Sequence, residues 1–287
     1  MKGAIPNIGM ASLADTGQWR LTVEISADGI AAVLKNTDYQ DADTLLLFRK
    51  EWISGSSELL DEVETAVYEN PRILEDFATR IILTTPKSLW IPADYTEDEE
   101  FDDRFFTSVY PAEPEDISAD FGAEEVCLYT LSPGLRSFLQ RTLPGSRISS
   151  HITVLKEAFE KIEAEKVKSL FSRPTLQSIY VNIDGRRADI MAFRDGKLLS
   201  AASHSWVEPM DITYTTLLVA KAYDMDPAET EITVAAPGEL TPEINAALVG
   251  IYPEISFIML PESVQEQGLS FAAALAAGDD FQIIANS

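Results

Sequence analysis

One stretch indicates the fold of the chain: Leu176-Gln-Ser-Ile-Tyr-Val-Asn-Ile-Asp-Gly-Arg-Arg-Ala-Asp-Ile-Met-Ala-Phe-Arg-Asp-Gly-Lys-Leu-Leu199. Its two Asp-Gly pairs, at 184–185 and 195–196, separate three runs rich in β-forming residues. Asp-Gly between such runs is a strong hairpin signal, because both central residues of a type I′ turn need positive φ. A helical run at 210–223 and a fourth strand-like run at 231–235 follow. The stretch therefore predicts a three-stranded meander, a crossover helix and a further strand.

The same order of elements recurs in the first half. Asp28-Gly29 marks its first turn, and the predicted strands are 19–25, 30–34, 44–48, 80–83 and 125–130. Helices are predicted from Ser56 or Ser57 to about 70, and from Ser132-Pro133 onward. In the second half, a helix from Thr241, a strand at 255–260 and a helix at 270–277 complete the pattern. Both halves thus show three strands followed by alternating helices and strands.

This duplication predicts an α/β fold with two tandem ribonuclease H-like lobes, each a five-stranded mixed sheet with flanking helices. That is the layout of the actin-like ATPase, sugar kinase and Hsp70 class, by analogy of fold. The expected divisions are an irregular N-terminal arm at 1–17, a first lobe at 18–145 and a second lobe at 176–287. Between the lobes, 146–175 contains a long helix that either links them or closes the first by packing on its sheet.

Composition narrows the class of protein. The 287 residues are 46% apolar, which suits a fold with a real core, and no segment reaches the ~20 apolar residues of a membrane helix. The sequence begins without the pattern of a signal peptide, and Cys127 is the single cysteine. We therefore expect a cytoplasmic protein without internal disulfides and without direct membrane insertion.

The net charge of −25 bears on partners. It argues against nucleic acid, where affinity comes from Lys and Arg contacts to phosphate, and against anionic membranes. Solubility is the favoured explanation, and a basic protein partner is the other. The acidic run Asp94, Glu97, Asp98, Glu99, Glu100, Asp102 and Asp103 is interpreted as a solvated face or a docking surface for such a partner. It lacks the spacing of a calcium loop, so no metal site is predicted.

The residues also resemble a known family. The segments 193–199 and 212–234, together with 19–35 and 81–92, are similar to an uncharacterised Bacteroidetes family called domain of unknown function 3822. The resemblance spans nearly the whole chain and implies the fold of an actin-like ATPase. Tyr214-Thr215 departs from it, because a pair of aromatic residues is expected there. The family carries no established activity, so the resemblance implies architecture and no catalytic residues.

Two hairpin loops are candidates for a split phosphate site. In actin-like ATPases one such loop from each lobe holds the phosphates, with an acidic residue near glycine. The corresponding residues would be Asp28, Gly29, Asp184, Gly185 and Arg186. The loops lack an Asp-x-Gly spacing and a following run of Gly, Ser and Thr. We therefore favour the interpretation that both pairs serve hairpin geometry alone.

A second candidate follows the strand at 231–235, where a nucleotide-binding relative places glycines. Here only Gly238 remains, and the helix beginning at Thr241 could offer N–H groups to an anion. Glu239 and Glu243 would repel that anion, so an ordinary helix start is favoured. Neither His151 nor His204 forms a recognisable catalytic spacing with Cys127, which lies in an apolar strand.

The leading hypothesis is a non-catalytic scaffold or adaptor of actin-like ATPase fold, without a cofactor, that binds an unknown protein partner. One alternative is an ATP-binding or phosphotransferase member of the fold that uses Mg-ATP in the cleft between its lobes. Another is a sensor of a small molecule other than a nucleotide. The poverty of both loops in Gly, Ser and Thr favours the first hypothesis over the second.

Overall fold

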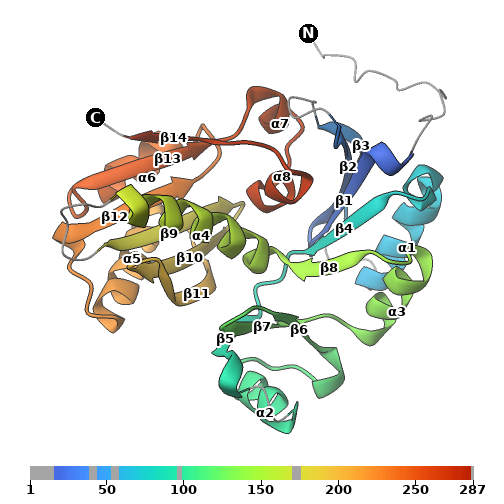
Figure 1. The fold of residues 1–287 in the computed structure, drawn as a ribbon, viewed down its shortest axis with the longest axis horizontal. Coiled ribbons are helices and arrows are strands. Elements are labelled where there is room, and N and C mark those ends of the chain that lie inside the picture. The colour runs from blue at the N-terminus through green and yellow to red at the C-terminus, as the bar shows by residue number, and fades with distance from the viewer. Residues whose placement is uncertain (1–15, 39–43, 53–57, 96–98, 170–175, 286–287) are drawn as a thin grey trace.

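The computed structural model describes residues 16–38, 44–52, 58–95, 99–169 and 176–285. Within these ranges two large mixed sheets form two lobes, and a smaller third sheet projects from the first lobe (Figure 1). The described part of the chain also contains five short 3₁₀ helices: Thr16–Gln18, Pro71–Leu74, Ala93–Tyr95, Pro114–Asp116 and Pro227–Glu229. None of the helices in the described ranges combines the length and the apolar character needed to cross a membrane.

The first sheet has the strand order β3-β2-β1-β4-β8. Its strands are β1 (Trp19–Ile25), β2 (Gly29–Asn36), β3 (Leu45–Glu51), β4 (Ala78–Leu83) and β8 (Arg147–Ser150). The first three are antiparallel neighbours, while β4 runs parallel to β1 and β8 parallel to β4. The helices α1 (Leu59–Glu69) and α3 (Pro133–Thr142) bury Val63 and Phe138 in one core with Leu21 of β1.

The second sheet repeats this plan with the order β11-β10-β9-β12-β13-β14. Its strands are β9 (Gln177–Asp184), β10 (Arg187–Arg194), β11 (Lys197–Ser205), β12 (Thr230–Ala235), β13 (Glu254–Met259) and β14 (Gln282–Ala285). The helices in this part of the chain are α5 (Pro209–Ala222), α6 (Thr241–Leu248), α7 (Glu262–Glu266) and α8 (Phe271–Ala277). The predicted two-lobed α/β architecture is confirmed, and β14 adds a sixth strand to the second sheet.

The predicted strand at 125–130 forms, but it does not belong to the first sheet. It is β7 (Glu125–Thr130), the centre of the third sheet between β5 (Ser88–Pro92) and β6 (Ile117–Phe121). The helix α2 (Glu99–Val109) packs against this sheet through the buried Phe106. The fifth strand of the first sheet is instead β8, which lies beyond residue 145. The sequence Arg-Ile-Ser-Ser of β8 gives little signal, because it contains one large apolar residue.

The three Asp-Gly pairs adopt three different turns. Type I′ geometry is present at 195–196, where Asp195 has φ 52° and Gly196 has φ 79°. At 184–185 only Gly185 has positive φ, and at 28–29 neither residue does. The type I′ prediction is therefore wrong for 184–185, and the turn at 28–29 does not have this geometry either. There a Cβ on residue 29 would lie 2.5 Å from a backbone oxygen of β3, so close approach of two strands requires glycine.

The long helix α4 (His151–Ser169) begins directly after β8 and contacts β10 and β11 of the second sheet. The helix α4 thus contacts β8 of the first sheet as well as the second sheet. Its Phe159 stacks on Tyr180 of β9 at a centroid distance of 4.5 Å, and the Tyr180 hydroxyl donates to Glu163 Oε1 at 2.7 Å. Aromatic stacking and a satisfied buried hydroxyl together fix α4 on the second sheet.

The helix α8 makes the reciprocal crossing. It lies between β13 and β14 of the second sheet in the chain, yet it contacts β1, β2 and β4 of the first sheet (Figure 1). Its Ala273 and Ala274 are buried against Ala31 and Val33 of β2. An ion pair between Lys35 Nζ and Asp279 Oδ1, 2.6 Å long and largely buried, holds the end of α8 to β2. Each lobe thus lends a helix to the other, and the two share one continuous apolar core.

Candidate functional site

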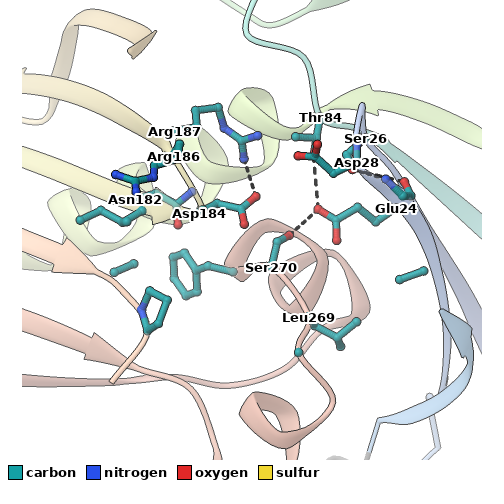
Figure 2. A pocket seen from close by; sticks show the side chains of 18 of the residues that line it. Glu24, Ser26, Asp28, Thr84, Asn182, Asp184, Arg186, Arg187, Leu269 and Ser270 are labelled. Atoms are coloured by element: carbon teal, nitrogen blue, oxygen red, sulfur yellow. Dashed lines mark hydrogen bonds and ion pairs between the residues drawn. The ribbon is translucent and has the colours of Figure 1, made fainter. Parts of the chain in front are cut away.

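A cleft of about 880 Å³ lies between the two lobes. Figure 2 shows that side chains from β1 and the following loop face side chains from the end of β9 across it. The start of α8 lies between the two groups, at Ser270. Asp28, Gly29, Asp184, Gly185 and Arg186, the residues predicted for a split phosphate site, all line this cleft. The structure therefore brings the two hairpin loops to one cavity.

The loop of the first lobe is held by its own serine. Ser26 Oγ accepts hydrogen bonds from the backbone N–H groups of Asp28 at 3.2 Å and of Gly29 at 3.1 Å. The Ser26 amide donates to the Gly29 carbonyl at 2.9 Å. A phosphate-binding loop needs backbone N–H groups that point outward to the anion. The N–H groups of residues 26, 28 and 29 point instead to partners within the loop.

The loop of the second lobe carries a chain of charged groups. Arg187 donates from Nη2 to Asp184 Oδ2 at 2.7 Å and from Nε to Asp189 Oδ1 at 3.1 Å. Burial alone would lower the pKa of this guanidinium, but the two carboxylates outweigh burial and raise it. Arg187 therefore links the exposed edge of the cleft to a buried carboxylate beneath it.

Asp189 is fully buried and accepts hydrogen bonds from several side chains at once. Besides Arg187, its donors are Ser203 Oγ at 2.6 Å, Asn182 Nδ2 at 2.9 Å and His151 Nε2 at 3.1 Å. Burial acts to raise the pKa of this carboxyl, but His151, Arg187 and the hydrogen bonds hold it well below its usual range. Because His151 is the first residue of α4, this network connects the N-terminal end of that helix to the strands of the second sheet.

Glu24 is a further acidic group of the cleft, and it was missed by sequence reasoning. Its Oε1 accepts a hydrogen bond from Ser270 Oγ at 2.5 Å and another from Thr84 Oγ1 at 3.2 Å. Burial raises the pKa of Glu24 above its ordinary value of 4.5, and the charge of Asp184 across the cleft adds to the rise. A signal was present, because Glu24 is the one charged residue between the apolar positions of β1 after Arg20.

Glu24 and Asn182 both line the cleft, one from each lobe. Glu24 lies one residue before the innermost pair of its β-hairpin, Ile25 with Ile30, and Asn182 lies two residues before the innermost pair of the other hairpin, Asp184 with Arg187. The two sheets thus direct a carboxyl from one lobe and an amide from the other toward the same cavity. The amide is already engaged with Asp189, so Glu24 is the more available of the two.

The segment after β12 also reaches the cleft. Gly238 lines it together with residues 235–237 and Glu239. Thr241 is not among the lining residues, and its hydroxyl donates to the Pro237 carbonyl at 3.4 Å. Of the two residues predicted for nucleotide binding, Gly238 is thus placed at the cavity and Thr241 is not.

The cations of the cleft already have protein partners. Arg49 donates to the Gly268 carbonyl, and Lys50 pairs with Glu69 at 3.0 Å. Arg186 donates to the Val207 carbonyl at 2.8 Å, and Arg187 is bound as described above. Against these four, five carboxylates line the described cavity: Glu24, Asp28, Glu51, Asp184 and Glu239. The cleft therefore offers an anion no excess of positive charge.

The remaining candidate residues lie apart from the cleft or at its edge. Cys127 is fully buried in the third sheet, where burial raises the pKa of its thiol. His204 lines the cleft, and burial lowers the pKa of its imidazole. Among the residues the structure describes, no three His, Cys, Asp or Glu side chains are grouped as a metal site would require. Part of the predicted acidic surface, residues 96–98, lies outside the described ranges.

The fold has counterparts among solved structures. A Bacteroides thetaiotaomicron protein with actin-like ATPase fold and unknown function has a TM-score of 0.73 and 19% identity, covering 95% of this chain and 100% of that chain. A chain of the PilM-PilN type IV pilus biogenesis complex has a TM-score of 0.51 and 12% identity, covering 92% and 98%. At these identities the likeness concerns the fold alone.

Sequence comparison gives a family. No curated protein matches the chain. The family described as "Protein of unknown function (DUF3822)" matches residues 11–246, which is most of the sequence. The chain therefore belongs to the DUF3822 family, and its fold is that of the actin-like ATPases.

Proposed function

We propose that this protein is a non-catalytic cytoplasmic scaffold or adaptor that has the actin-like ATPase fold without its nucleotide chemistry. The observation that carries the proposal is that the cationic side chains of the cleft are already bound to protein oxygens. Arg49, Lys50, Arg186 and Arg187 all donate to protein oxygens. A bound triphosphate would have to break these contacts and also face five carboxylates.

The first loop supports the same proposal. Stabilising a transferring phosphoryl group requires donors aimed at the place where charge develops. The amides of Ser26, Asp28 and Gly29 are bonded within their own loop. An ATP-binding or phosphotransferase role would therefore need both loops to rearrange, and it is the less favoured alternative.

A scaffold role also agrees with the use of this fold elsewhere. The PilM-PilN type IV pilus biogenesis complex is an assembly of proteins, and one of its chains shares the two-lobed fold with this protein. The likeness gives a precedent for the fold within a complex and does not identify a partner for this chain.

The cleft itself supports a second candidate. Its volume of about 880 Å³ lies within the ~300–1,000 Å³ typical of small-molecule pockets. A sensor that binds a non-nucleotide ligand between the lobes would use this space without needing free cations. Such a ligand would be neutral or cationic, because the lining carboxylates outnumber the lining cations.

The scaffold proposal is tested first by thermal unfolding with and without millimolar Mg-ATP. A ligand at about a hundred times its Kd stabilises a fold by ~2.7 kcal/mol, which corresponds to a rise in Tm of roughly 5–11 °C for domains of this size. We expect no such rise and no phosphate release above buffer. Purification of the native protein from its cells should yield a stoichiometric protein partner whose binding is indifferent to ATP.

Two variants separate the alternatives if a rise in Tm occurs. A rise that disappears in Asp184→Ala would make the ATP-binding alternative correct. A rise that survives both Asp28→Ala and Asp184→Ala would place a ligand site elsewhere in the cleft. Recovery of the native protein without any partner, at several salt concentrations, would contradict the scaffold role itself.

A further inference from the structure

One face of α5 carries large apolar side chains in solvent. Met210, Tyr214 and Leu218 are 57%, 64% and 47% exposed, and they are spaced four residues apart along the helix. Val207, two residues before the helix, is 71% exposed. Residues four apart form a continuous ridge on a helix surface, the kind of ridge that packs into the groove of a second helix. Exposed apolar patches of this kind mark interaction sites.

The fold of this chain does not require that ridge. The opposite face of α5 already anchors the helix to the second sheet through Ile212, Thr213, Thr216 and Ala220, all buried. The neighbouring α6 packs beside this anchored face, where Thr213 Oγ1 donates to the Ala247 carbonyl at 3.1 Å. The ridge therefore lies on the side of α5 away from its partners within the chain.

The charges around the ridge are arranged in a self-complementary way. In a protein of net charge −25, the 14 residues of α5 include one acid, Asp211, and one base, Lys221. The acids Glu208 and Asp211 lie at the N-terminal end, and Lys221 lies at the C-terminal end without an ion pair to any described residue. Tyr214 is midway between Met210 and Leu218, and also midway between Val207 and Lys221.

We propose that α5 is a homodimer interface, in which two copies of the protein pack their α5 ridges antiparallel about a two-fold axis at Tyr214. In this arrangement Met210 of one copy lies against Leu218 of its mate, and Tyr214 lies against its own equivalent. Lys221 lies beside Glu208 of the other copy. Antiparallel helices also place each C-terminal end beside the oppositely charged N-terminal end of the mate.

A second copy of this protein fits the α5 ridge better than a different protein of similar charge would. Two molecules of charge −25 repel each other over most of their surface, so they can approach only where acidic groups are few or are matched by a base. The α5 ridge provides both conditions, and a two-fold axis uses each charge twice. A helix of 14 residues spans about 21 Å. The contact is therefore smaller than the ~1,200 Å² of a stable interface, and the dimer should depend on concentration.

Site-specific crosslinking tests the arrangement. Cys127 is fully buried and gives no background, so single cysteines can be introduced on the surface. Tyr214→Cys should form a covalent dimer with a short bis-maleimide. Met210→Cys alone and Leu218→Cys alone should do so roughly tenfold more slowly, because equivalent residues would be about 12 Å apart along the helix axes. A mixture of these two variants should give the heterodimer efficiently.

The control is Tyr68→Cys, which replaces another exposed tyrosine on a helix, α1. Equal crosslinking of Tyr68→Cys and Tyr214→Cys would show random collision and overturn the proposal. Rapid self-crosslinking of Met210→Cys would overturn the antiparallel arrangement. In sedimentation over about a hundredfold range of concentration, the wild type should shift from monomer to dimer, and a monomer throughout would refute the interface. Leu218→Asp should weaken the dimer by roughly tenfold or more, because it places a charge against the apolar ridge of the mate.

Discussion

Glu24 faces the cleft as an acid whose two donors, Ser270 and Thr84, come from different parts of the chain. Burial raises its pKa, so the folded protein holds a proton that the unfolded chain releases more readily. A group with a raised carboxyl pKa makes folding less favourable as pH rises from the unfolded value toward the folded one. This destabilisation of the folded state is absent when the pH is below 4.5, the ordinary pKa of a glutamate, and it is complete when the pH is above the pKa of Glu24 in the folded protein.

Glu24→Gln should therefore stabilise the protein at neutral pH. The amide oxygen can still accept from Ser270 and Thr84, and the cost of burying a charge is removed. We expect the Tm of the variant to exceed that of the wild type at pH 7, by about 2–4 °C for each kilocalorie gained, and the difference to shrink as pH falls to 4.5. The matched control, Glu51→Gln at the exposed rim, should show little change. A variant less stable than wild type at pH 7 would contradict this reading of Glu24.

The part of the site that could be predicted from the sequence rests on patterns of neighbouring residues. Asp-Gly pairs at 28–29 and 184–185 located the two loops, because turn chemistry depends on neighbouring residues. The pairing of Asp189 with His151 joins residues 38 positions apart that the fold brings together, and no spacing in the sequence announces it. Arg187 and Asp189 lie two residues apart on β10, so their side chains share one face of the sheet. That pairing decides whether the cleft has a free cation, so the character of the site could not be derived from the loops alone.

At the scale of elements, α8 is distinguished by its small side chains. Phe271 is followed by alanine at five of the remaining six positions, and Ala274 has no exposed surface. Alanine lets the helix lie close to both α4 and β2, where a longer side chain would collide. The helix can therefore pack closely between the two lobes.

Ala274→Leu should destabilise the protein by about 1–3 kcal/mol, because extra methylenes in a close-packed site force neighbouring side chains out of place. Denaturation in urea measures the loss. Ala246→Leu, on the exposed side of α6, is the matched control and should change the free energy of unfolding by no more than ~0.5 kcal/mol. Equal effects at the two positions would show that α8 is not closely packed.

Length explains which elements were predictable. The seven-to-nine-residue strands of the two hairpin sets were found, because alternation and turns mark them together. The four-residue strands β8 and β14 were not predicted, because pairing with neighbouring strands, and not their own sequence, determines where they begin and end. The strand at 125–130 was found but placed in the wrong sheet, because a strand pattern does not name its neighbours.

At the scale of the whole molecule, the two lobes exchange helices. A chain ending at residue 260 keeps the strands of the first sheet but lacks α7, α8 and β14. Ala31 and Val33 of β2 would lose the alanines that cover them, and Lys35 would lose Asp279. We therefore expect hydrogen exchange in β1 and β2 to lose protection in this truncated chain.

The control truncation ends at residue 281 and removes β14 alone. It should retain protection in β1 and β2, because α8 and Asp279 remain. Full protection in the chain ending at 260 would contradict the exchange of helices as a source of stability for the first lobe. Loss of protection in both truncations would indicate that the second lobe as a whole supports the first.

The position of α8 has a consequence for biosynthesis. The strands of the first lobe are complete once the ribosome has passed Ser150, but the helix that seals them begins at Phe271. At ~5–20 residues per second, translation of the intervening segment takes roughly 6–24 s. During that time the face of β2 that α8 later covers is exposed on the nascent chain. Chaperone contact, if it occurs, should therefore concentrate on nascent chains in this window and end when α8 emerges.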